Sequence, residues 1–154
     1  MDTKNKELLL KDLNARLPYG VKIELTRWVM GEGTYINTTL EPDHIEQLLN
    51  DEDGDTEIKP YLRPMSSMTE EEAKELSILC DITGVLSIKI TDEYIDFEVD
   101  DGFSSIETKI IWYNDIISSI EIFDWLNKNH FDYRGLIPMG LAIAVTKENN
   151  PYKK

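Results

Sequence analysis

The sequence predicts an α+β fold, in which an antiparallel sheet packs about three helices on one face. Three consecutive blocks between residues 86 and 110 alternate apolar and polar side chains, which is the period of β-strands. Apolar residues at helical spacing occur in separate segments before and after these blocks. With 154 residues and 41% hydrophobic content, we expect a single domain, 1–154, around one core.

The first part of the chain is predicted to form a helix and then a β-hairpin. Between residues 6 and 17 four leucines share one side at helical spacing: Leu9, Leu10, Leu13 and Leu17. The pattern ends at Pro18 and Gly20. Two extended segments follow, 21–26 and 34–40, and the glycines between them favour a turn.

Residues 41–58 are predicted to form a mobile acidic linker. Every charged residue from Glu41 to Glu57 is acidic, and the stretch 50–55 has the composition of a solvated loop. The prolines at 60 and 64 then favour an extended path, because each fixes its own φ and disfavours helix before it.

A three-stranded meander is predicted from the alternating blocks, and its second turn constrains the register. If Asp101 and Gly102 form a two-residue turn, Phe97 faces Ile106 and Asp96 faces Glu107. The same register places Ile95 opposite Thr108 and Tyr94 opposite Lys109. The apolar side chains then share the buried face and the carboxylates share the other.

Capping signals predict the two remaining helices. Thr69 and Glu72 are spaced as a capping box before an apolar side of Leu76, Leu79 and Cys80. A helix from about 119 to 130, with Ser118 and Glu121 at capping-box spacing, buries Ile122, Phe123 and Leu126. Residues 141–145 are interpreted as a last, buried strand of the sheet.

Composition restricts the function classes. Sixteen Lys and Arg against thirty Asp and Glu give a net charge of −14, which repels nucleic acid and anionic membrane, so we expect no direct binding to either. The chain has one cysteine and no apolar run long enough to cross a bilayer or serve as a signal peptide. We therefore expect a cytoplasmic protein with no cofactor and no metal centre.

An acidic strand face is the strongest physical signal for a contact surface. Its predicted members are Asp92, Tyr94, Asp96, Glu98, Asp100 and Glu107. The segment around Tyr61, Arg63 and Met65 is a second candidate contact, because these residue types are enriched at interfaces. The acidic face is expected to dock a basic partner protein, to imitate DNA, or only to keep the sheet soluble.

A polar cluster at the end of the last predicted helix supports an alternative hypothesis. In a small enzyme that used the cluster of His130, Asp132, Tyr133 and Arg134, the histidine would be a base oriented by the aspartate, and the arginine would hold an anionic substrate. The same residues are also typical of a helix end, where an imidazolium is favoured by the helix dipole. The sequence offers no phosphate loop, nucleophile elbow or metal-binding His-Glu-x-x-His to accompany them.

Three stretches carry a resemblance: 17–22, 60–72 and 124–142. Through them the chain resembles an uncharacterised family of small acidic proteins from gut bacteria, their phages and other mobile elements. The resemblance implies a mobile-element context and no chemistry. The leading interpretation is a non-enzymatic, cytoplasmic protein-binding or regulatory module whose acidic face docks a basic partner; its oligomeric state is left open.

Overall fold

The computed structural model describes residues 1–112 and 119–153. Within them the chain forms two compact units, Met1–Arg63 with Leu136–Lys154, and Pro64–Gly135. The predicted α+β class is confirmed, but the strands divide between a four-stranded and a three-stranded sheet where one sheet was expected. The chain was interpreted as one domain, whereas the second unit interrupts the first in sequence.

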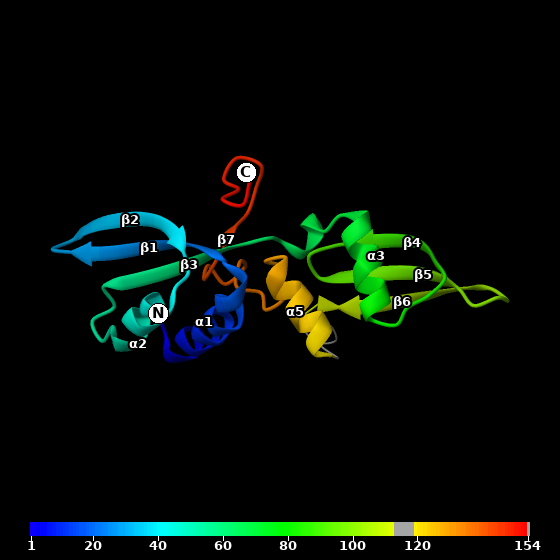
Figure 1. Ribbon diagram of the computed structural model, residues 1–154, viewed down its shortest axis with the longest axis horizontal. Coiled ribbons are helices and arrows are strands. Elements are labelled where there is room, and N and C mark those ends of the chain that lie inside the picture. Colours follow the sequence, from blue (N-terminus) through cyan, green and yellow to red (C-terminus); the bar gives the residue numbers. More distant parts are fainter. Residues whose placement is uncertain (113–118, 154) are drawn as a thin grey trace. The chain divides into compact units, whose positions relative to one another are not determined.

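The first unit is a mixed sheet with two helices packed on it (Figure 1). Its elements are α1 (Thr3–Arg16), η1 (Leu17–Tyr19), β1 (Lys22–Val29), β2 (Glu32–Thr39), α2 (Pro42–Asn50), β3 (Thr56–Leu62) and β7 (Ile143–Ala144). The strand order is β2-β1-β3-β7, with β7 parallel to β3 and the other pairs antiparallel. The predicted helix, hairpin and C-terminal strand are therefore present, although β7 has only two residues.

The core of the first unit follows the predicted apolar pattern. Leu9 and Leu13 of α1 pack with Ile23 and Leu25 of β1. The core also contains Val21, Leu40, Ile45, Leu48, Ile58, Leu62, Leu136, Leu141 and Ala142. An ion pair between Asp12 and Arg16, with Nε to Oδ2 at 2.7 Å, is also fully buried.

The acidic segment 41–58 is not an irregular linker, which corrects the prediction. Its first part is α2, with Pro42 at the start and a capping box between Glu41 and His44. Ile45 and Leu48 are buried, so the carboxylates form the solvent side of an amphipathic helix. Composition alone had suggested a solvated loop because acidic residues outnumber the apolar ones that anchor the helix. The mobility of this segment stays a prediction.

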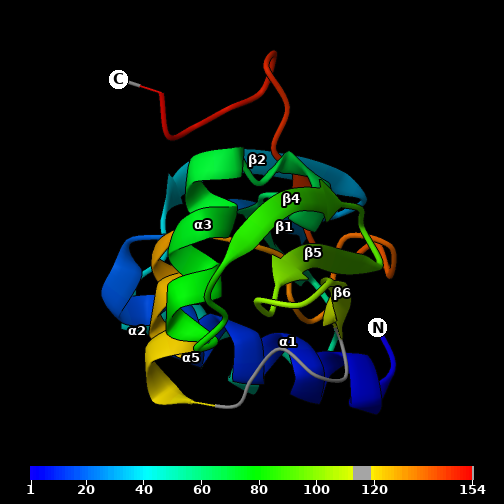
Figure 2. The ribbon, with the colours of Figure 1, turned by 90° about the vertical axis from the view of Figure 1, so that its right-hand side faces the viewer.

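The second unit packs α3 and α5 on one face of an antiparallel sheet (Figure 2). Its elements are η2 (Met65–Ser67), α3 (Glu70–Leu79), β4 (Val85–Ile90), β5 (Tyr94–Asp100), β6 (Ser105–Ile111) and α5 (Ile120–Lys128). Ile95 and Phe97, both 0% exposed, lie beneath the helices with Leu76, Ile122 and Leu126. The predicted inward face of the meander is therefore correct for Ile95 and Phe97 on β5, whereas Leu86 and Ile106, expected on the same buried face, are 60% and 49% exposed.

The helix starts of the second unit match the predictions only partly. Thr69 and Glu72 form the expected capping box before α3, with both backbone N–H groups bonded to the opposite side chain. At α5, Ser119 is the N-cap and accepts a hydrogen bond from the N–H of Ile122. The expected cap, Ser118, lies outside the described residues.

The predicted register between β5 and β6 is wrong by two residues. Asp100 faces Ser105, so the loop has four residues and not two, and Asp96 faces Lys109 where Glu107 was expected. A shift of two leaves every side chain on its predicted face, because the side-chain period of a strand is two. The like-charged pair across the strands is therefore Glu98 with Glu107.

Among residues 1–112 and 119–153, no helix combines the length and the apolar character that crossing a membrane requires.

Candidate functional site

The polar cluster 130–134 begins with a helix end. His130 has a left-handed backbone, φ 60°, directly after the C-cap Asn129 of α5. Its N–H donates to the carbonyl of Asn127 at 3.1 Å, and the N–H of Phe131 donates to that of Leu126 at 3.1 Å. These two bonds define a Schellman motif, which satisfies carbonyls that the helix leaves open. The backbone of His130 is therefore part of the machinery that ends α5.

The other members of the cluster also make structural contacts. The hydroxyl of Tyr133 donates to Oδ1 of Asn127 at 3.0 Å and accepts from Nε of Arg134 at 3.2 Å. The Arg134 guanidinium lies 5.6 Å from the ring centre of Phe123, and Asp132 is only 2% exposed. These contacts hold the chain after α5. Within the described residues no group of three or more His, Cys, Asp or Glu could hold a metal ion.

The middle of the predicted acidic face carries lysines on both sides of its central carboxylate. Asp96 faces Lys109 on β6 and Lys89 on β4. Both ammonium groups also lie over the ring of Tyr94, at 4.1 Å for Lys109 and 5.7 Å for Lys89. The pKa of Lys89 is raised, mainly by a hydrogen bond with Tyr94 and next by the charge of Tyr94. The middle of the face is thus electrostatically balanced, unlike the regular negative array of a DNA imitation.

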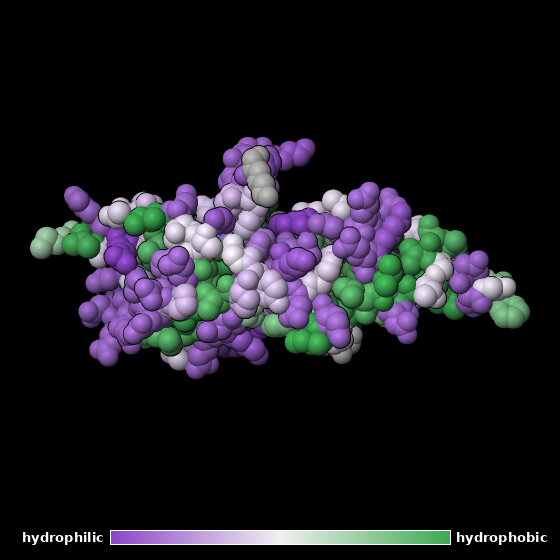
Figure 3. Space-filling model, in the orientation of Figure 1, coloured by the Kyte–Doolittle hydropathy of each residue, from purple (hydrophilic) through white to green (hydrophobic). Residues whose placement is uncertain are grey.

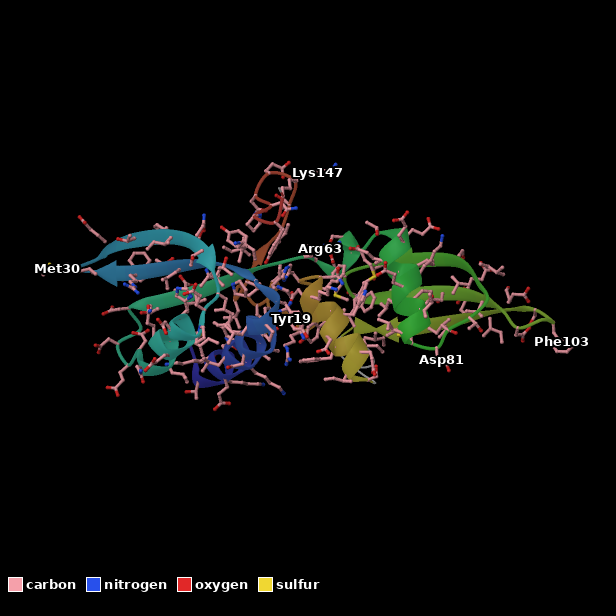
Figure 4. All side chains as sticks on the ribbon, viewed as in Figure 1. Tyr19, Met30, Arg63, Asp81, Phe103 and Lys147 are labelled. Atoms are coloured by element: carbon pink, nitrogen blue, oxygen red, sulfur yellow. The ribbon has the colours of Figure 1, made fainter. Side chains whose placement is uncertain are left out.

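The loop end of the same sheet presents an aromatic side chain to solvent. Phe103 is 99% exposed at the tip of the β5–β6 hairpin, where Figure 4 shows it beyond the strands. Asp101 Oδ1 accepts hydrogen bonds from the N–H groups of Phe103 and Ser104, at 2.9 and 2.8 Å, and Asp100 Oδ1 accepts from Gly102 at 2.8 Å. The bonds from Ser104 and Phe103 lower the pKa of Asp101. The loop is therefore held by carboxylates.

An apolar patch continues from Phe103 along the strands. Leu86 and Ile106 are 60% and 49% exposed, and Val99, opposite Ile106, is half-buried. Figure 3 shows hydrophobic side chains gathered over the β4–β6 strands. Every charged residue between Thr91 and Thr108 is acidic. We name Leu86, Val99, Asp100, Asp101, Phe103 and Ile106 the Phe103 end.

The other predicted contact residues are mostly unavailable to a partner. Tyr61 and Met65 are 8% and 1% exposed, so their proposed role as side-chain contacts is corrected by their burial. Burial is also the main cause that raises the pKa of Tyr61. Arg63 is half-buried, and Asp92 uses Oδ1 to accept a hydrogen bond from the N–H of Ser66 at 3.1 Å. Tyr61 and Met65 were predicted as contacts because their residue types are enriched at interfaces. The structure buries Tyr61 on strand β3 and Met65 in the core of the second unit.

A hollow of about 500 Å³ in the first unit was not predicted from the sequence. It lies between the N-terminal half of α1 and strand β3, with Asp51 near one end and Leu141 in its wall. Its lining residues are far apart in sequence, and none carries a recognisable motif. No periodic signal in the chain could have located it.

Comparison of the chain with models of protein families, with curated proteins and with solved structures found no match. A functional inference therefore depends on the surfaces and contacts of this chain. The resemblance to an acidic mobile-element family stays a prediction.

Proposed function

We propose that the protein is a non-enzymatic binding module of the cytoplasm that docks a basic partner protein through the Phe103 end. The observation that supports this most is the near-complete exposure of Phe103, 99%, on a loop whose backbone N–H groups donate hydrogen bonds to its own Asp101 carboxylate. Large aromatic residues supply much of the energy of protein interfaces.

The hydrogen bonds of the loop favour binding because they fix the anchor in advance. Asp101 accepts from two successive backbone N–H groups, and its own N–H donates to the carbonyl of Ser104 at 3.2 Å. Ordering a flexible loop at an interface costs free energy, and a loop that is already ordered avoids that cost. Phe103 is thereby presented as a pre-organised anchor.

The surrounding charge defines the chemistry of the expected partner. Asp100 and Asp101 flank the aromatic anchor, and Glu98 and Glu107 face each other on the adjoining strands. A complementary surface is an apolar pocket bordered by Lys or Arg. Such charge pairing steers association and raises its rate, an effect that salt screens. The contact proposed from the sequence thus moves from the middle of the strands to their loop end.

The enzyme hypothesis gains no support from the 130–134 cluster. Tyr133 donates its hydroxyl to Asn127 and receives a hydrogen bond from Arg134, while the backbone of His130 ends α5. A catalytic cluster is expected to converge on a space that a substrate can enter. The contacts seen instead stabilise the segment that follows the helix.

The proposal is tested by capturing partners with the tagged full chain and with Phe103→Ala. Met30→Ala is the matched control, because Met30 is equally exposed, 102%, at the tip of the β1–β2 hairpin (Figure 4). We expect a basic protein to be captured at low salt by the wild type and by Met30→Ala, and Phe103→Ala to bind it at least about 30-fold more weakly.

Three results would count against the proposal. Equal binding by Phe103→Ala excludes the aromatic anchor, and an equal loss with Met30→Ala shows that any exposed apolar tip has the same effect. Binding that does not weaken at high salt excludes the charge complementarity with Asp100 and Asp101.

A further inference from the structure

The described strands at the edges of the two sheets are protected to different degrees. An edge strand presents a row of unpaired backbone groups, which proteins usually shield by shortness, bulges or charge. Strand β7 has only two residues, and β4 carries a register shift between Val85 and Ser87. Strand β6 carries two charged residues, Glu107 and Lys109. The remaining edge strand, β2, has eight residues and an unbroken register with β1.

Strand β2 lacks each of these protections. It contains no proline and no lysine, and Glu32 at its first position is its only charged residue. Tyr35 and Ile36 in its middle are 62% and 47% exposed. Figure 1 shows β2 beside β1, on the side away from β3. Among the described strands none lies on the other side of β2, so this edge is open.

The hydrogen bonds of β1 identify the backbone groups at the open edge. The N–H of Trp28 donates to the carbonyl of Asp55, directly before β3, at 2.9 Å. Trp28 and its partner Gly33 therefore turn their backbone groups away from each other, and such directions alternate along a strand. The N–H of Leu40 donates to Val21 at 2.8 Å, as this alternation requires. The outward-facing residues of β2 are the odd-numbered ones: Gly33, Tyr35, Asn37 and Thr39.

Side-chain contacts hold β2 in place. The rings of Trp28 and Tyr35 meet edge to face, with their centres 6.4 Å apart. Oδ1 of Asn37 accepts a hydrogen bond from the hydroxyl of Tyr61 at 3.1 Å. Ordering a flexible segment at an interface costs free energy, and a strand that is already ordered avoids that cost. The open edge is therefore pre-organised for pairing.

We propose that β2 pairs in antiparallel fashion with β2 of a second copy of this chain, across a two-fold axis at Ile36. In this register Tyr35 lies opposite Asn37 of the second copy, and Gly33 lies opposite its Thr39. Every outward residue of both strands then exchanges both of its backbone hydrogen bonds. An axis one residue earlier would place Thr39 opposite a turn residue and use less of the edge.

The lack of charge on β2 favours a second copy as its partner. A neutral edge matches a neutral strand, and β2 is itself such a strand. Glu32 of one copy and Glu32 of the other lie at opposite ends of the pair. For eight residues of strand they are about 27 Å apart, well beyond the screening length of about 10 Å. At the axis the two exposed Ile36 side chains cover each other.

Salt distinguishes this contact from the proposed partner surface. Each chain carries a net charge of −14, so two copies repel each other at long range, and salt screens this repulsion. Pairing through β2 should therefore strengthen as the salt concentration rises. Docking of a basic partner at the Phe103 end should weaken. The two contacts use different units of the chain, so either proposal stands if the other fails.

The test is sedimentation velocity of the full chain over a range of concentrations, at low and at high salt. We expect the weight-average mass to rise toward twice that of the monomer by about 1 mM protein, and at lower concentrations in high salt. Ile36→Lys places two ammonium groups face to face at the axis and should weaken dimerisation at least about fivefold. Ile78→Lys, the same charge change at a 75% exposed position of α3, is the matched control and should dimerise like the wild type.

Two further variants test the axis and the backbone bonds. Ile36→Glu should also dimerise weakly, but its mixture with Ile36→Lys pairs opposite charges at the axis and should form a heterodimer. Tyr35→Pro removes an outward N–H and no bond to β1, so it should keep the fold and weaken the dimer.

Hydrogen exchange measured by NMR gives a direct readout of the edge. In the wild type the outward amide protons, those of Tyr35 and Asn37 in particular, should exchange more slowly as the protein concentration rises. The amides of Thr34 and Ile36 face β1 and should change much less.

Five results would overturn the proposal. The first is a wild type, and a mixture of Ile36→Lys with Ile36→Glu, that stay monomeric under all conditions. The second is equal dimerisation by the wild type and Ile36→Lys, and the third is an equal loss with Ile78→Lys. The fourth is a loss with Phe103→Ala, which would assign self-association to the Phe103 end. The last is slower exchange of the outward amides only when a different protein is added, which would identify a foreign strand as the occupant.

Discussion

The β1–β2 and β5–β6 hairpins both end in an exposed apolar side chain, but they are built differently. In the first unit Val29 pairs with Glu32, and the turn residues Met30 and Gly31 both have positive φ, 50° and 82°. In the second unit the backbone N–H groups of the four-residue loop around Phe103 donate hydrogen bonds to the carboxylates of Asp100 and Asp101. Exposure is nearly equal at the two tips, so the proposed anchor role of Phe103 depends on the hydrogen bonds within its own loop and not on exposure alone.

The two units also depend on groups in different ionisation states, a neutral hydroxyl in the first unit and a charged carboxylate in the second. In the first unit the hydroxyl of Tyr152 donates to the carbonyl of Tyr61 at 2.7 Å and accepts from the N–H of Lys22 at 3.0 Å. Burial raises the pKa of Tyr152 to about 12, because removal from water penalises the charged phenolate. The loop of the second unit needs the ionised carboxylate of Asp101, whose pKa is lowered. Alkali should therefore weaken the first unit and acid the second.

The largest expected effect is the alkaline loss of stability caused by Tyr152. Its pKa is 10.0 in an unfolded chain and about 12 when folded, so its contribution is complete below pH 10 and disappears as the pH rises through 12. The loss should be about 2 kcal/mol in the free energy of unfolding, measured by urea denaturation at a series of pH values. Tyr152→Phe should remove this part of the pH dependence. An unchanged profile in the variant would contradict the role of Tyr152.

A smaller effect is expected at the turn of the first hairpin. Gly31→Ala places a Cβ at φ 82°, in the left-handed region that L-residues avoid, and should lower the free energy of unfolding by about 1 kcal/mol. Urea denaturation measures the change. Glu32→Ala, next to the turn in ordinary strand geometry, is the control and should stay within about 0.5 kcal/mol of wild type. A cost shared by both variants would mean that the left-handed turn is not its source.

The reverse substitution at the neighbouring position sharpens the same comparison. Met30→Gly relieves a left-handed L-residue at φ 50° and should raise the free energy of unfolding by a few tenths of a kcal/mol, since the flexibility of glycine offsets part of the gain. Differential scanning calorimetry can resolve such a shift. A clear destabilisation would show that the exposed Met30 side chain has packing partners of its own.

The most local effect is expected at the loop of the second hairpin. Asp101→Ala removes the acceptor for the N–H groups of Phe103 and Ser104, so both amides should exchange with solvent several-fold faster. Asp101→Asn keeps an acceptor oxygen and should change exchange much less. In wild type the order of the loop is present above the ordinary pKa of 3.8 and is lost as the pH falls through the lowered value. Unchanged exchange in Asp101→Ala would remove the argument for a pre-organised anchor.

The register error shows where sequence reasoning reached its limit. Alternation alone correctly predicted that Phe97 is buried and that Asp96 points away from the core. It could not decide the loop length, because an Asp-Gly pair favours a two-residue turn while consecutive carboxylates favour a longer loop that they can cap. Asp100 and Asp101 supply that second preference, and the structure follows it.

Local capping chemistry was predictable, but long-range pairing was not. Thr69 and Glu72 are only three positions apart, and their capping box formed as predicted. The candidate hollow depends on α1 and β3, which are separated by the hairpin and α2, so no local pattern describes it. The helix in segment 41–58 was missed although Ile45 and Leu48 have helical spacing, because the acidic composition was given more weight than the period.

The parallel pairing of β7 with β3 has a consequence for biosynthesis. Residues 64–135 form a continuous segment with their own core, whereas the first unit needs residues on both sides of that segment. During synthesis on the ribosome, residues 64–135 are complete before Ile143 and Ala144 are added. The sheet of the first unit needs these two residues for strand β7. We therefore expect the middle of the chain to fold first and the two ends to close last.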